Sequence, residues 1–144
     1  MRDFVWSPTE KKVARAAFDA AFARECAAIR LEAEAMLKRS SDPAAVWRVH
    51  DYLSEKRREI DQKYDFRYSV LASVLGRLLV EGWVRNVEIA KLKPEKIEWI
   101  RRSASAWKQA DASKRFEPQR RDAKTPRLKR YPSPVRSLRR PLPS

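Results

Sequence analysis

The sequence predicts an all-α protein made of a long antiparallel helical hairpin, a small helical head and a basic C-terminal tail. Three observations predict this class. Only 2 glycines occur in 144 residues, so the tight turns of β-hairpins are nearly excluded. Ala, Leu, Arg, Glu and Lys, which are strong helix formers, dominate the chain. Apolar residues recur at three- and four-residue intervals, the spacing of one helix face.

The first predicted helix begins at a capping box. Ser7 and Glu10 have the S-x-x-E spacing, and Pro8 occupies the first helical position, where its missing N–H is not needed. The helix extends to about Arg39, and its roughly 32 residues span about 48 Å at 1.5 Å each. That length exceeds the diameter of the globule expected for a chain of this size. The part of the helix that extends beyond the globule therefore needs an outside partner. Its apolar seam is Phe18, Phe22, Cys26, Ile29, Ala33 and Leu37.

A second helix is predicted to have Asp42 as its N-cap and Pro43 at its first position, and to end at about Tyr64. The short connection between the helices makes them an antiparallel hairpin. We expect this hairpin to form a homodimer, because alanines along the first helix let two backbones approach closely. The stripe expected to be buried on the second helix is Val46, Val49, Leu53, Ile60 and Tyr64.

Shorter helices after Asp65 are predicted to form the head. A third helix follows Asp65 and ends near Gly82, a residue that suits a C-terminal cap. Its apolar residues are Phe66, Val70, Leu71, Val74, Leu75, Leu78 and Leu79. A short helix covers residues 87–92. Pro94 then opens a last helix that reaches about Trp107, with Ile97, Trp99 and Ile100 as apolar anchors.

The composition changes after this helix. The predicted division is a helical domain (1–107), comprising the hairpin (7–64) and the head (65–107), and a tail (108–144). Residues 103–144 hold 12 Lys and Arg against 3 acids, a net charge of +9, and six of the nine prolines lie beyond residue 117. Such a segment buries too little apolar surface to offset its ordering entropy, so we expect disorder. Nucleic-acid binding is an open alternative, and only through this tail.

Several classes of protein are disfavoured by composition. The single cysteine, Cys26, excludes an intrachain disulfide, and its place in the apolar seam predicts a buried thiol and a reducing compartment. No apolar run of about 18 residues occurs, so we expect a cytoplasmic protein without membrane contact. With 1 His and 1 Cys, no His/Cys metal set can form, and no glycine-rich phosphate loop is present. We expect no cofactor.

One side of the second helix combines an aromatic ring with charged groups. Trp47, His50 and Asp51 share this side at helical spacing, and Arg57 follows further along. One interpretation is a solvated face with intrahelical ion pairs. The other is a protein-binding hot spot, in which Trp fills a pocket and Arg pairs with carboxylates. Ser54 one turn from His50 does not make a catalytic set, because a regular helix offers no oxyanion donors, so we expect no enzyme.

The run WRVHDYLSEKRREIDQKYDFRYSV, residues 47–70, resembles the signature of the fluorescence recovery protein family of cyanobacteria. The matching residues are Trp47, His50, Asp51, Leu53, Ser54, Lys56, Arg57, Glu59, Ile60, Asp61, Lys63, Tyr64, Asp65, Arg67, Ser69 and Val70. The likeness continues through Leu78, Leu79, Glu81 and Gly82, and covers roughly residues 7–102. The Ala- and Arg-rich composition indicates a divergent homologue from a different bacterial lineage.

The resemblance implies an all-helical homodimer whose hairpins form the interface. It also implies binding to the photoactivated orange carotenoid protein, chiefly through the C-terminal domain of that partner. This binding accelerates the return of the partner from the red to the orange form and ends phycobilisome fluorescence quenching. The partner-binding residues carried over are Trp47, His50, Asp51, Arg57 and Lys96. The expected dimer-interface residues are Val46, Val49, Leu53, Phe18, Phe22 and Ile29.

The chain departs from the family pattern in the head and in the tail. Ser73 stands where the cyanobacterial proteins carry an aromatic residue of their partner contact, and Trp83 is a candidate substitute. The basic tail has no counterpart in the short cyanobacterial proteins. A host without phycobilisomes would retain the fold and supply a different partner, so a helical dimeric adaptor is the alternative function.

Overall fold

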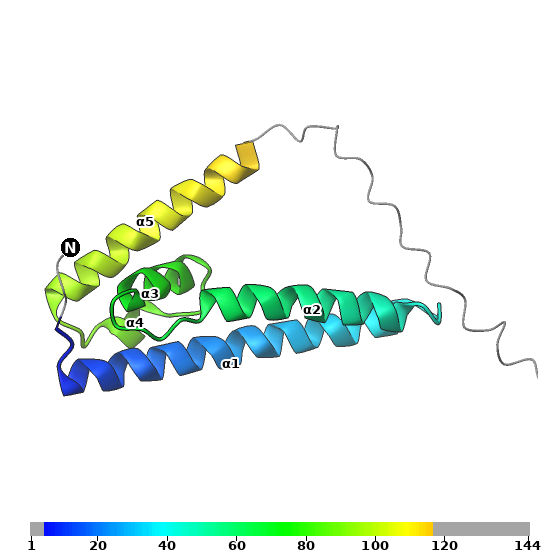
Figure 1. The fold of residues 1–144 in the computed structure, drawn as a ribbon, viewed down its shortest axis with the longest axis horizontal. Coiled ribbons are helices and arrows are strands. Elements are labelled where there is room, and N and C mark those ends of the chain that lie inside the picture. The colour runs from blue at the N-terminus through cyan, green and yellow to red at the C-terminus, as the bar shows by residue number, and fades with distance from the viewer. Residues whose placement is uncertain (1–4, 117–144) are drawn as a thin grey trace, which may run out of the picture.

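The computed structural model describes residues 5–116, which form five helices and no strand (Figure 1). Two long helices, α1 (Pro8–Arg39) and α2 (Ala45–Lys63), lie side by side as an antiparallel hairpin. Three further helices, α3 (Leu71–Val80), α4 (Asn86–Ile89) and α5 (Pro94–Phe116), gather at the end of the hairpin where the chain begins. The all-α class, with its long hairpin and small head, is confirmed.

The start of α1 follows the prediction. The backbone N–H of Glu10 donates to the Ser7 hydroxyl, and the backbone N–H of Ser7 donates to the Glu10 carboxylate, each at 3.2 Å. This reciprocal pair satisfies two donors that the helix leaves unpaired. The helix ends at Arg39, with Lys38 and Arg39 in its last turn, where positive charge is favourable.

The start of α2 lies three residues after the predicted N-cap. The Asp42 carboxylate accepts from the backbone N–H of Ala44 at 3.0 Å, and the Asp42 carbonyl accepts from that of Ala45 at 2.9 Å. These bonds fold Pro43 and Ala44 into a turn before the helix, and the N-cap is Ala44 without a side-chain bond. Asp42 therefore caps a turn instead of the helix, since Asp competes well for such local bonds.

The third helix begins at Leu71, later than expected. The carbonyl of Tyr68 accepts from the Trp6 indole N–H at 3.2 Å, and the Val70 N–H donates to the Arg67 carbonyl at 3.0 Å. These bonds hold the segment before Leu71 in turns against the N-terminus. The end is as predicted: Gly82 has φ +84°, a conformation that glycine adopts without strain.

The last helix is longer than predicted, and the preceding one is shorter. The α4 helix stops at Ile89, and a turn from Ile89 to Leu92 replaces its expected second half. The α5 helix continues past Trp107 to Phe116, so residues 108–116 are helical rather than the start of the tail. The rest of the expected tail lies outside the described residues. No helix of residues 5–116 is long and apolar enough to cross a membrane.

The core lies in the head and includes the first half of α1. Leu71, Leu75, Leu78, Ile89 and Ile100 are its largest fully buried side chains. They pack with a set from the N-terminal region, namely Trp6, Ala14, Ala17, Phe18 and Ala21. The α3 and α5 helices approach closely because α3 carries Gly76, where a Cβ would lie 2.7 Å from the Ser103 Cβ.

Candidate partner-binding surface

The Trp47 face comprises Trp47, His50, Asp51 and Arg57 on the side of α2 turned away from α1. Trp47 is 47% exposed, and its ring meets that of His50 edge to face, with centroids 6.3 Å apart. His50 Nδ1 lies 3.5 Å from an Asp51 carboxylate oxygen, and Arg57 Nε donates to both carboxylate oxygens of Asp61 at 3.1 Å. Trp47, His50 and Asp51 therefore lie next to one another, and Arg57 lies about three turns from Trp47 along the same helix.

The opposite side of α2 fixes the orientation of this face. Ala45, Val49, Ile60 and Lys63 are buried there, where α2 packs on α1. Because these residues recur with the helical period, the Trp47 face is directed outward. It is held on a regular helix, which gives a partner a preorganised surface.

The chemistry of the Trp47 face suits protein recognition. An exposed indole offers a large flat surface that loses little entropy on binding, and Trp and Arg are the residues most enriched in hot spots. The ion pair of Arg57 with Asp61 is exposed at 78% and 61%, so it contributes little to folding and Arg57 is available for a partner carboxylate. Within residues 5–116, Ser54 makes no hydrogen bond to His50, and no cluster suited to a metal ion occurs.

Lys96, predicted to contact the partner, is buried and paired within the chain. Its side chain is buried, and Nζ donates to both carboxylate oxygens of Glu10 at 2.8 and 2.9 Å and to the Val5 carbonyl at 2.8 Å. Burial opposes the charge of Glu10, but hydrogen bonds from Lys96 and from the backbone of Ser7 and Lys93 hold the pKa of Glu10 at about 2. The pair joins α1 to α5.

The residues expected at the dimer interface fall into two groups. Phe22, Val46 and Leu53 are 43%, 57% and 42% exposed, and Ile29 is half-buried, so these four, the apolar strip, leave apolar surface uncovered on the hairpin. Phe18 and Val49 are each only 7% exposed. Phe18 packs edge to face on Tyr64 and Phe66 inside the chain, which leaves it little surface for a second copy.

Cys26, expected to be buried, is half-buried.

A second ionic network is buried where α1, α2 and α3 meet, and the sequence reasoning missed it. Lys63 Nζ lies 2.7 Å from Glu25 and 2.6 Å from Glu81, and the Tyr64 hydroxyl donates to Glu25 at 2.9 Å. Burial, then the bond to Glu25, raises the pKa of Tyr64. All three helices contribute a charged group, so the network fixes the head on the hairpin. In the sequence, this network was indicated only by Glu25, an acidic residue among the alanines of α1.

Trp107, rather than Trp83, lies beside Ser73 in the head. The Trp107 indole N–H donates to the Ser73 carbonyl at 3.3 Å, and the Arg77 guanidinium lies 4.9 Å from its ring centroid. Trp83 packs against the core, and its carbonyl accepts from Arg24 at 2.8 Å. The spacing of Trp107 from the buried Ile100, seven residues earlier, was the sequence signal for this contact.

Comparisons with known proteins agree in sequence and in structure. A family model described as the photoprotection regulator fluorescence recovery protein matches residues 6–104. The fluorescence recovery protein of Synechocystis sp. is 38% identical over 91 residues, which are 63% of this chain and 84% of that protein. The solved structure of the Fremyella diplosiphon protein is 38% identical, covers 70% of this chain and 99% of its own, and has a TM-score of 0.65. The solved Synechocystis structure gives 37% identity, the same coverage and a TM-score of 0.66.

Proposed function

Because the chain belongs to the family of the photoprotection regulator fluorescence recovery protein, we propose that it binds the photoactivated orange carotenoid protein and accelerates its red-to-orange reversion. The observation that carries the proposal is the Trp47 face, an exposed indole with the exposed Arg57 about three turns further along the same helix. Binding that favours an intermediate on the return path lowers the barrier without covalent chemistry. The end of phycobilisome quenching follows from this reversion.

The acting species in this proposal is a homodimer. The apolar strip has Phe22 and Ile29 on α1 and Val46 and Leu53 on α2, and much of it is exposed in the single chain. Large exposed apolar patches on a protein surface commonly mark an interface. On α2 the helical period places Val46 and Leu53 next to His50 and Arg57, so the Trp47 face borders the proposed dimer seam.

The test is the dark recovery rate of the photoactivated orange carotenoid protein, with and without this protein. Trp47→Ala and Arg57→Gln should each weaken binding by at least about 30-fold, the effect of a hot spot of about 2 kcal/mol, and slow recovery accordingly. Trp99→Ala is the matched aromatic control, since Trp99 is 43% exposed in α5. Arg30→Gln is the matched charge control, because Arg30 makes the same kind of exposed pair with Glu34.

The outcomes distinguish the proposal from its alternative. The proposal is supported if the native chain accelerates recovery and only the Trp47 and Arg57 variants lose this acceleration. A folded dimer without any acceleration would contradict the proposed partner and favour a helical adaptor for another protein. Equal losses in the control variants would contradict the assignment of the Trp47 face.

A further inference from the structure

The outward side of α2 continues from Trp47 to Arg58. These residues are 11 positions apart, about three full turns of the helix, so both side chains leave α2 in nearly the same direction. Asp51 and Ser54 lie between them, four and seven residues after Trp47, and so follow the same direction. We call this row the outer line of α2; it consists of Trp47, Asp51, Ser54 and Arg58.

Arg57 lies to one side of the outer line. It follows Trp47 by ten residues, which leaves it about 80° around the helix from Trp47. This rotation turns Arg57 toward Leu53, on the side of the proposed dimer seam. Arg57 Nε also donates to both carboxylate oxygens of Asp61 at 3.1 Å. A partner that approaches the exposed indole from outside therefore meets Arg58 before Arg57.

The guanidinium of Arg58 has no partner within the described part of the chain. Arg58 is exposed and makes neither an ion pair nor a hydrogen bond to any of residues 5–116. Asp61, three residues further on, is held by Arg57 instead. Of the 12 arginines in residues 5–114, nine pair with a carboxylate of the chain, so an unpaired guanidinium is the exception. Arg58 can bind an external carboxylate without first giving up an internal one.

The outer line specifies the chemistry of the surface that it fits. At 1.5 Å per residue, the 11 residues from Trp47 to Arg58 span about 16 Å along α2. The side chains between them are short and polar, so the line has an aromatic anchor at one end and a cationic anchor at the other. We propose that Arg58 is a specificity-determining residue of the partner contact. The partner then presents an apolar pocket for Trp47 and, about 16 Å away, a carboxylate for Arg58.

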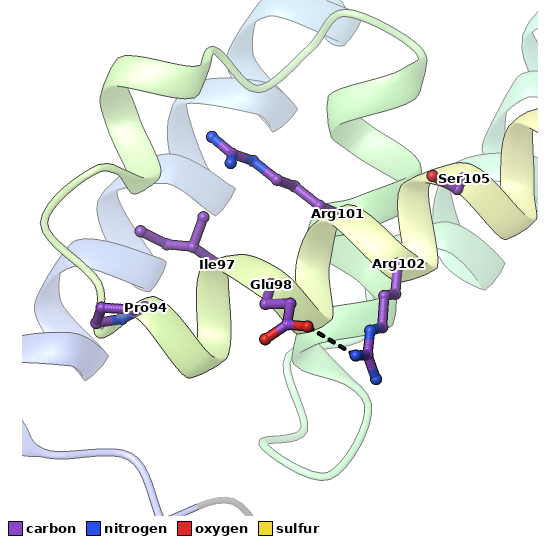
Figure 2. Close-up of a pocket in the computed structure, with 6 residues that line it drawn as sticks. All are labelled: Pro94, Ile97, Glu98, Arg101, Arg102 and Ser105. Atoms are coloured by element: carbon purple, nitrogen blue, oxygen red, sulfur yellow. Dashed lines mark hydrogen bonds and ion pairs between the residues drawn. The ribbon is translucent and has the colours of Figure 1, made fainter.

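Arg101 supplies a matched control for this inference, which rests on the proposed function. Like Arg58, it is exposed and has no carboxylate partner in the part of the chain that the structure describes. It lies on α5 in the head, where it lines an open pocket of about 500 Å³. Figure 2 shows its side chain apart from the pair that Arg102 forms with Glu98 at 2.7 Å. Arg101→Gln therefore removes the same charge as Arg58→Gln, at a position outside α2.

The test measures the affinity of the full chain for the orange carotenoid protein under continuous illumination, by biolayer interferometry at about 0.05 M and 0.5 M salt. At the lower salt, Arg58→Gln should weaken binding about tenfold, as expected for the loss of one charge-assisted pair. At the higher salt the loss should shrink to about threefold or less, because ions screen an exposed pair. Arg58→Lys should lose about threefold at low salt, since an ammonium group cannot bind a carboxylate in the bidentate way. Arg101→Gln should change the affinity by no more than about twofold.

The outcomes separate this inference from the function on which it rests. If the native chain does not bind the illuminated protein, the proposed function fails and this inference fails with it. If the native chain binds and Arg58→Gln binds equally well, the role of Arg58 is refuted and the proposed function stands. An equal loss in Arg101→Gln, or a loss in Arg58→Gln that does not shrink with salt, would also refute it. Circular dichroism of each variant checks that the helices are intact.

Discussion

Replacing Lys96 by Met tests whether this residue holds the fold together or contacts a partner. In the native chain its ammonium group bonds both oxygens of Glu10 and the Val5 carbonyl, and it lies 5.0 Å from the Trp6 ring centroid. Met fills a similar volume without charge. The substitution therefore leaves the Glu10 carboxylate, which is 3% exposed, with only the more distant Lys93 ammonium, at 3.9 Å.

The expected loss is large because burial opposes an unpaired charge. Removing one partner of a buried ion pair lowers the free energy of unfolding by about 3–5 kcal/mol. The change of this loss with pH tests the same reasoning independently. Native Glu10 has a pKa of about 2, below its ordinary value of 4.5, because its hydrogen bonds, led by those from Lys96, outweigh the effect of burial. Without the Lys96 hydrogen bonds the pKa of Glu10 should rise, because burial is then opposed only by the backbone N–H groups of Ser7 and Lys93 and by the distant Lys93 ammonium. The variant then takes up a proton at a higher pH than the native chain, so its loss of stability should shrink as pH falls.

Urea unfolding followed by circular dichroism measures both effects. The difference between the native chain and Lys96→Met should be about 3–5 kcal/mol at pH 7 and smaller at pH 5, and Glu10→Gln/Lys96→Met should recover much of it. A loss below about 1 kcal/mol, or a larger loss at pH 5 than at pH 7, would refute the reasoning. Folded Lys96→Met should also keep its effect on carotenoid-protein recovery. Loss of that effect at full helicity would return Lys96 to the binding surface.

Three further predictions concern packing, pH and assembly. Gly76→Ala places a Cβ 2.7 Å from that of Ser103 and should lower the free energy of unfolding by about 1–3 kcal/mol, as urea titration would measure. The pKa of Glu10 is about 2, against an ordinary value of 4.5, so this carboxylate contributes at most about 3 kcal/mol to the free energy of unfolding above pH 4.5. That contribution should be lost as pH falls toward 2, and the urea midpoint should fall with it. Leu53→Glu puts charge into the proposed dimer seam, and light scattering should then give the chain mass of 16.9 kDa instead of twice that value.

The local parts of the fold were predictable from the sequence because local chemistry determines them. Ser7 and Glu10 form the capping box that their spacing indicated, and Gly82 ends α3 with a positive φ. The errors arose where distant contacts compete with local preference. The start of α3 is delayed because the Trp6 indole, 62 residues away along the chain, binds the Tyr68 carbonyl. No pattern confined to one segment contains that information.

In the candidate site, too, the local features were predictable and the distant contacts were not. The exposed Trp47 face follows from the period of one helix, so the sequence was sufficient to place its residues together. The burial of Lys96 was not predictable, because a lysine is seldom fully buried and its partner Glu10 lies 86 residues away along the chain. The burial of Phe18 was not predictable either, because the apolar seam of α1 does not show that its first half packs in the core of the head.

The two ends of the hairpin are stabilised in different ways, and this difference bears on function. At the head, a series of aromatic rings in contact runs into the core and ends at the exposed Phe22: Trp6, Tyr68, Phe66, Phe18, Tyr64 and Phe22. Beyond Phe22 the core cluster of the head has no member until Leu71, and the buried apolar residues of the hairpin there are Ala45, Val49 and Ile60, where α2 pairs with α1. A second copy on the apolar strip would supply the missing burial there. If the dimer supplies this burial, separating the protomers should weaken partner binding even when Trp47 is intact.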